Sequence, residues 1–118
     1  MLTIYGIKNC STMKKAFDWL DQHQMAYQFF DYKKQAIDAK ALQSWIDQLG
    51  LEVVINKRGM TWRKLTEEQK TQAEHADSAI ILLQAQPSMI KRPIIVNSEG
   101  QVVLVGFDAV AYQAALIT

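Results

Sequence analysis

Cys10 is the one cysteine in this chain, and it lies between a short apolar run, Leu2 to Tyr5, and an amphipathic stretch that begins at Ser11. A cysteine at a helix N-terminus ionises readily, because free backbone N–H groups and the positive end of the helix dipole stabilise a thiolate. Lys8 and Lys14 are among the polar residues that surround the cysteine. The polar surroundings favour a reactive nucleophile over the alternative, a free cysteine that only fills the core.

Arg92 is a second candidate, because it directly precedes Pro93 in the polar interruption Lys91-Arg92-Pro93. An X-Pro peptide bond can be cis, and a cis bond here would direct Arg92 toward Cys10. Its guanidinium could then stabilise a thiolate or hold an oxyanion through two hydrogen bonds. A surface arginine before an ordinary trans proline is the alternative, and spacing alone does not choose between them.

The segment from Asn56 to Lys64 places four cations around a glycine and Trp62. Such a cluster can line an anion pocket or belong to a solvated loop. We interpret Arg58 as a candidate substrate-facing residue and Trp62 as a structural one. His23 and His75 lack the paired spacing of zinc ligands, so we predict no metal site.

Apolar periodicity predicts the elements that position these residues. A helix is expected from Ser11 to Gln22, where apolar residues recur on one face. An aromatic-rich strand near residues 27–32 would pair in parallel with the first strand. Asp38 and Gly50 are typical of the N-cap and the end of a second helix.

Two further helices are expected in the middle of the chain. Thr66-Glu67-Glu68-Gln69 has the form of a capping box, with the glutamates in the first turn. Asp77 is predicted to cap a buried helix from Ser78 to about Gln86, which Pro87 would end.

The C-terminal part reads as a hairpin followed by a helix. Ile94–Val96 and Val102–Val105 flank the turn sequence Asn97–Gly100, and Asp108 would cap the last helix. The order is β-α-β, a helical insertion at about residues 36–88, then β-β-α. We therefore expect an α/β fold of thioredoxin-like topology, with a four-stranded mixed sheet, in a single domain over residues 1–118.

The composition argues against several classes of protein. Thirteen basic and twelve acidic residues give a formal net charge of +1, too balanced for a dedicated nucleic-acid binder. The longest apolar run, residues 79–83, is far shorter than the roughly 20 residues of a membrane span. The first residues lack the basic and apolar regions of a signal peptide. We expect a cytoplasmic protein with no membrane segment and no direct contact to nucleic acid.

Three motifs, in order along the chain, resemble the arsenate reductase (ArsC)/Spx family, and most closely its YffB-like branch. They are Ile4–Ala16, Asn56–Leu65 and Gln86–Ile94, and the resemblance covers essentially the whole chain. It implies a thioredoxin-like domain with a helical insertion and a nucleophile at Cys10. It also implies an anion site with Arg92, and with Arg58 by similarity to the Spx-type loop.

Three departures from the family pattern bear on function. Glutathione-coupled arsenate reductases have a histidine in the stretch where this chain has Gly6, and Lys8 or Lys14 would partly replace it as a stabiliser of the thiolate. Those enzymes also have another arginine on the last strand, where this chain reads Leu104–Phe107. Spx-type regulators often have a Cys-x-x-Cys switch, and Met13 occupies its second position here. With no resolving thiol in the chain, an adduct on Cys10 must be resolved by an external thiol.

The preferred hypothesis is a glutathione-dependent thiol oxidoreductase in which Cys10 attacks a disulfide or a small oxyanion substrate. The amides of Ser11 and Thr12 would stabilise the thiolate. Arg92 and Arg58 would hold a carboxylate or oxyanion. Glutathione would be a co-substrate with no tightly bound cofactor, and glutaredoxin a candidate partner. The alternatives are an arsenate reductase and an Spx-like regulator that binds RNA polymerase.

Overall fold

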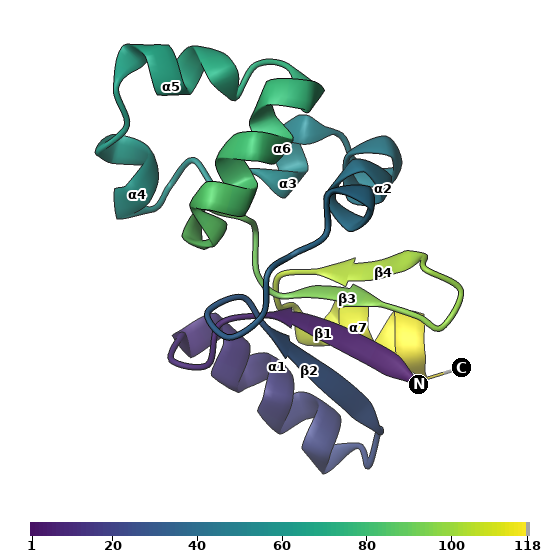
Figure 1. Ribbon diagram of the computed structural model, residues 1–118. Coiled ribbons are helices and arrows are strands. Elements are labelled where there is room, and N and C mark those ends of the chain that lie inside the picture. Colours follow the sequence, from purple (N-terminus) through teal and green to yellow (C-terminus); the bar gives the residue numbers. More distant parts are fainter. Residues whose placement is uncertain (118) are drawn as a thin grey trace. The chain divides into compact units, whose positions relative to one another are not determined.

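The computed structural model describes residues 1–117. They fall into two compact units, one made of Met1–Asp31 and the segment from Arg92 onward, the other of Tyr32–Lys91. Figure 1 labels the α-helices and strands of both units, which are described separately below. Within the described range, no helix is both long enough and apolar enough to cross a membrane.

The first unit contains a four-stranded mixed sheet in the order β2-β1-β3-β4. Its strands are β1 (Leu2–Gly6), β2 (Tyr27–Asp31), β3 (Ile94–Val96) and β4 (Val102–Val105). β1 pairs in parallel with β2, whereas β1 with β3 and β3 with β4 are antiparallel. The sequence-based prediction of a mixed α/β sheet with one parallel pair is confirmed.

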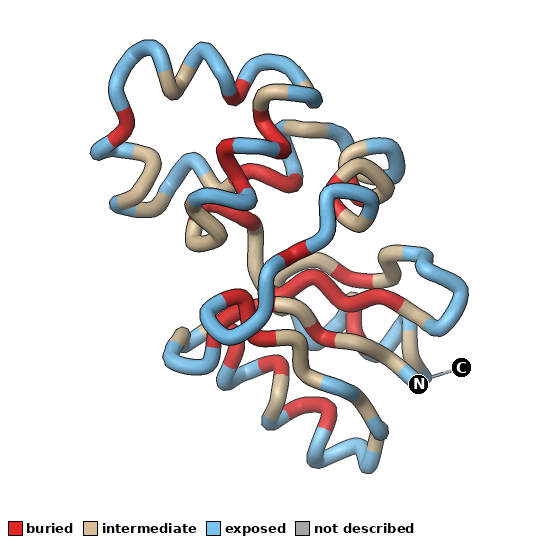
Figure 2. Tube along the Cα trace, viewed as in Figure 1, coloured by how far each residue is buried: buried red, intermediate tan, exposed pale blue. Residues whose placement is uncertain are grey.

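Helices α1 (Ser11–Gln22) and α7 (Ala109–Leu116) supply the helical side of this unit's core. Ile4 and Ile95 on the strands share one buried cluster with Met13 and Leu20 of α1 and with Tyr112 of α7. Buried segments appear red in Figure 2: β3 is buried along its whole length, and buried residues recur along α1. The bounds predicted for α1 are confirmed, because its apolar residues recur at the helical period.

The hairpin and the last helix form as the local sequence predicts. The side-chain oxygen of Asn97 accepts hydrogen bonds from the amides of Glu99 and Gln101, each at 3.0 Å. Gly100 adopts a φ of 82°, a conformation that glycine reaches without a steric penalty. Asp108 caps α7 by accepting a hydrogen bond from the amide of Val110 at 3.3 Å.

The second unit is helical. Its elements are α2 (Ala39–Leu49), α3 (Leu51–Val54), α4 (Met60–Arg63), α5 (Glu67–Gln72), α6 (Ala76–Ala85) and the 3₁₀ helix η1 (Pro87–Met89). These helices lie between residues 39 and 89, and the single domain with a helical insertion at about residues 36–88 stays a prediction. Asp38 caps α2 through the amide of Lys40, and Gly50 follows its last residue, as predicted.

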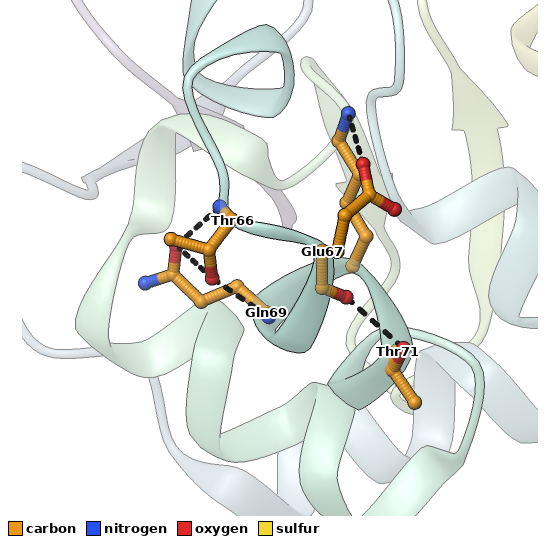
Figure 3. A network of polar contacts seen from close by, with 5 residues as sticks. Thr66, Glu67, Gln69 and Thr71 are labelled. Carbon is orange, nitrogen blue, oxygen red and sulfur yellow. Dashed lines mark hydrogen bonds and ion pairs between the residues drawn. The ribbon is translucent and has the colours of Figure 1, made fainter.

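Helix α5 begins with the predicted capping box (Figure 3). The Thr66 hydroxyl accepts a hydrogen bond from the amide of Gln69 at 3.1 Å, and the Gln69 side chain accepts one from the amide of Thr66 at 3.0 Å. These two bonds satisfy donors that a helix N-terminus otherwise leaves unpaired. Glu67 and Glu68 lie in the first turn, as expected.

One predicted cap is wrong. α6 begins at Ala76 with His75 at the N-cap, so Asp77 lies inside the first turn instead of before the helix, and the helix ends at Ala85. The Ser78 hydroxyl donates to the backbone oxygens of Gln72 and His75, which ties the helix start to the preceding turn. A carboxylate in the first turn still suits the positive end of the helix dipole.

Candidate functional site

Cys10 lies at the N-cap of α1, directly after the loop that follows β1. Its backbone is extended, with a φ of −146° and a ψ of 132°. Its carbonyl oxygen accepts the first hydrogen bond of the helix, from the amide of Lys14 at 2.9 Å. The sulfur is neither sealed in the core nor fully exposed. This position directs the thiol toward the unpaired amides of the first turn.

The surroundings of Cys10 lower the pKa of its thiol. Partial burial is the largest single influence and acts in the opposite direction, because it disfavours the charged form. The backbone amide of Met13, a hydrogen bond from Arg92, the amide of Thr12 and the positive charge of Arg92 together outweigh it. The neutral thiol makes no conventional capping hydrogen bond, so these donors act chiefly on the thiolate.

Arg92 reaches Cys10 from the loop before β3. The Arg92-Pro93 peptide bond is cis, which settles the choice that the sequence left open. Pro93 is buried, and its carbonyl oxygen accepts a hydrogen bond from the amide of Gly106 at 2.8 Å. The last residues before α7 therefore hold the Pro93 loop in place.

Gly6 and Met13 complete the support of the site, and sequence reasoning missed this role for both. A Cβ atom added to Gly6 would overlap the Sδ and Cε atoms of Met13 and would lie 3.5 Å from the Cβ of Arg92. Met13 is fully buried. The end of β1, the first turn of α1 and the Pro93 loop thus meet at Gly6. The signal in the sequence was a glycine at the end of a predicted strand, which lies seven residues before an apolar position of the predicted helix.

The other residues predicted to stabilise the thiolate lie in the first unit and differ in what they contact. Thr12 contributes its amide to the thiolate, and the second contributing amide is that of Met13, not the predicted Ser11. Lys8 is exposed. Lys14 makes an ion pair with Asp18 at 3.0 Å on the outer face of α1. The role predicted for these lysines stays a prediction.

Arg58 and Trp62 belong to the second unit. Arg58 is exposed, and its backbone amide donates to the side-chain oxygen of Asn56 at 3.1 Å. Lys57 and Lys70 place their ammonium groups 5.3 and 5.8 Å from the Trp62 ring centre, which gives this tryptophan a structural role. Among residues 1–117 there is no group of three or more side chains suited to hold a metal ion.

Comparison with known proteins identifies one family whose model matches most of this chain. The model of the ArsC family matches residues 5–115 of this chain. The YffB protein has a solved structure with a TM-score of 0.89 and 50% identity, covering 98% of this chain and 99% of that one. An arsenate reductase (ArsC) related protein from Brucella melitensis follows with a TM-score of 0.74 and 44% identity, over 99% and 95% of the two chains.

Two curated relatives extend the comparison. An uncharacterized protein of Haemophilus influenzae is 42% identical over 115 residues, 98% of both chains. The global transcriptional regulator Spx of Streptococcus pneumoniae is 23% identical over 101 residues, 84% of this chain and 74% of the regulator. The predicted resemblance and the thioredoxin-like fold class are confirmed.

Proposed function

We propose that this chain, which belongs to the ArsC family, is a glutathione-dependent thiol oxidoreductase with Cys10 as its nucleophile. The family and its arsenate reductase-like structural neighbours support an oxidoreductase. The observation that carries the finer proposal is the pairing of a partly accessible Cys10 with Arg92 and the first-turn amides of α1.

The chemistry follows from one activated sulfur. The Cys10 thiolate attacks the glutathione sulfur of a glutathionylated substrate, forms a mixed disulfide with glutathione and expels the substrate thiolate, which takes up a proton. A second glutathione, as its thiolate, then attacks the glutathione sulfur of that mixed disulfide. Oxidised glutathione leaves, and the Cys10 thiolate is restored. The net reaction converts one mixed disulfide and one glutathione into a free thiol and oxidised glutathione.

Each surrounding group has a role in these two steps. The amides of Thr12 and Met13 and the Arg92 guanidinium stabilise the thiolate both as attacking group and as leaving group. An external thiol is required because the chain contains no second cysteine. Arg92 would also hold a substrate carboxylate or oxyanion beside Pro93. Glutaredoxin is an alternative source of the external thiol, and the cytoplasm, where thiols are kept reduced, is the fitting compartment.

The proposal is tested by glutathione-coupled reduction of a glutathionylated peptide, followed through NADPH consumption by glutathione reductase. The wild-type chain is expected to turn over, Cys10→Ser to be inactive, and Arg92→Gln to be slowed about 10-fold or more, the loss expected for one charge-assisted contact. Lys15→Gln removes an exposed positive charge from α1 and is the matched control. A Cys10→Ser protein as active as the wild type would refute the proposal.

Arsenate reduction is a second candidate. One solved neighbour at 44% identity is described as related to arsenate reductase, and the Arg92 guanidinium beside Cys10 has the chemistry to hold an oxyanion. Arsenate-dependent oxidation of glutathione, with glutaredoxin present, distinguishes this activity. Absence of turnover with arsenate, beside activity on a mixed disulfide, would remove it.

A third candidate, from the Spx relatives, is a regulator that binds RNA polymerase. The test is capture of the isolated C-terminal domain of the polymerase α chain. Stoichiometric binding that survives Cys10→Ser would favour this function over the enzyme.

A further inference from the structure

Tyr112 of α7 is completely buried in the core of the first unit. Its ring packs edge-on against Phe107 and Trp19, with ring centres 4.9 and 5.4 Å away. Its hydroxyl donates a hydrogen bond of 2.6 Å to the carbonyl oxygen of Gly106. Burial raises the pKa of the Tyr112 phenol above its ordinary value, so the hydroxyl keeps its proton over the pH range in which a cysteine titrates. The aromatic contacts therefore fix the position of a donor that does not titrate there.

Gly106 joins this hydroxyl to the loop that carries Arg92. Its amide donates to the Pro93 oxygen at 2.8 Å, one position beyond the paired strand residues Ile94 and Val105. Proline has no N–H, so the carbonyl is the only backbone group through which Pro93 itself can be hydrogen-bonded. Gly106 has a φ of 72°, a conformation that glycine reaches at little cost. Both polar backbone groups of Gly106 thus take part, the carbonyl with the phenol and the amide with Pro93.

The last link runs from Pro93 to the sulfur. Arg92 is bonded directly to Pro93 and donates a hydrogen bond to Cys10, where its positive charge also favours the thiolate. A hydrogen bond weakens steeply when its geometry is lost, so the contribution of Arg92 depends on where its backbone is held. The amides of the first turn of α1 contribute separately. The whole series of contacts lies within the first unit.

We propose that Tyr112 is a positioning residue for Cys10: through Gly106 and Pro93, its hydroxyl holds Arg92 in the place from which the guanidinium reaches the sulfur. The inference rests on the proposed function, in which Cys10 is the nucleophile, and adds to it a residue of the last helix. Because Tyr112 acts through Arg92, its loss should affect the sulfur only while Arg92 is present.

The experiment measures the pH dependence of Cys10 alkylation by iodoacetamide, which needs neither glutathione nor a second enzyme. Tyr112→Phe keeps the ring and removes the hydroxyl, and it should raise the midpoint by about 0.5 pH unit, which is about threefold less thiolate at a pH below the midpoint. The shift should be smaller than that of Arg92→Gln, because the guanidinium is displaced and not removed. The plateau rate at high pH should stay within about twofold of the wild type, since thiolate nucleophilicity varies only weakly with pKa.

A double variant separates positioning from a general loosening of the fold. In the Arg92→Gln background, Tyr112→Phe should not move the midpoint any further, because the group that it positions is gone. A purely structural effect would move the midpoint by the same amount in both backgrounds. That additive result would overturn the proposal.

Tyr27→Phe is the matched control. It removes a hydroxyl that donates to the Asp21 carboxylate at 3.1 Å, on the edge strand β2 of the same unit, and it should leave the midpoint unchanged. An unchanged midpoint in Tyr112→Phe, or an equal shift in Tyr27→Phe, would contradict the positioning role. A shift confined to Tyr112→Phe, in a protein that does not turn over the glutathionylated peptide, would refute the proposed function and still support that role.

Discussion

Replacing Gly6 with alanine tests whether Met13 supports the Cys10 site. The backbone itself tolerates alanine, because Gly6 is not among the glycines with positive φ. Reduced freedom of the unfolded chain would then stabilise the protein by about 0.4–1 kcal/mol. The new Cβ, however, would overlap the Sδ and Cε atoms of Met13, whereas its 3.5 Å approach to the Arg92 Cβ is an ordinary contact.

The collision should outweigh the entropy gain. Overpacking a core costs about 1–3 kcal/mol. A methionine end is flexible, but Met13 is completely buried in the cluster with Ile4 and Leu20, so its displacement must disturb neighbours. We expect Gly6→Ala to lower the free energy of unfolding by about 1–2 kcal/mol net. If the repacking also moves the backbone of Met13, the pKa of Cys10 should rise, because the Met13 amide lowers it.

A double-mutant cycle measured by urea denaturation gives the decisive comparison. Met13→Ala alone should cost about 2–5 kcal/mol, because it leaves a cavity. In the Gly6→Ala background the same change relieves the overlap, so its cost should be smaller by about 1–2 kcal/mol, within the range of couplings between touching residues.

Gly59→Ala is the matched control. Its φ of −81° suits alanine, and its Cβ would lie 3.3 Å from an asparagine side-chain nitrogen. We expect the free energy of unfolding to change by less than about 1 kcal/mol, because alanine adopts this backbone conformation without strain and restricts the unfolded chain only slightly. If the stability losses of Gly6→Ala and Met13→Ala simply add in the double variant, the two residues are not coupled, and the proposed contact between them is refuted.

Four further outcomes are expected. Arg92→Gln should move the pH midpoint of Cys10 alkylation by iodoacetamide upward, and Arg92→Lys should move it less; an unchanged midpoint would separate Arg92 from the thiolate. Because the folded-state pKa of Cys10 is depressed and the unfolded thiol has its ordinary value near 9.0, the unfolded state holds more protons between the two values. Stability of the wild type relative to Cys10→Ser should therefore rise with pH through that window and be lost as pH falls through the folded pKa, as measured by denaturation at several pH values. Tyr112→Phe removes the 2.6 Å hydrogen bond to the Gly106 oxygen and should lower the free energy of unfolding, measured in urea, by about 1–2 kcal/mol. A change near zero would contradict the view that this bond stabilises the fold. Thr66→Ala deletes the capping box of α5 and should cost about 1 kcal/mol, whereas equal stability would show that α5 contributes nothing to cooperative unfolding.

Local sequence determined most of the secondary structure. The apolar period of α1, the caps at Asp38, Thr66 and Asp108, and the turn at Gly100 act through residues close in the chain, so each can be recognised from a short window. The start of α6 was misplaced because Asp77 is a good cap in isolation. The Ser78 hydroxyl donates instead to the backbone oxygens of Gln72 and His75, and these contacts tie the start of the helix to the preceding turn.

The site required the tertiary structure. Sequence alone determined that Cys10 lies at the start of a helix and that the chain contains no second cysteine, because the first follows from local order and the second from a count of residues. The cis bond before Pro93 and the approach of Arg92 to the sulfur depend on segments that are distant in the chain. So does the role of Gly6, which is visible only in the atoms that fill the space where its side chain would be. Such contacts arise from packing three elements together, and no single stretch of sequence specifies them.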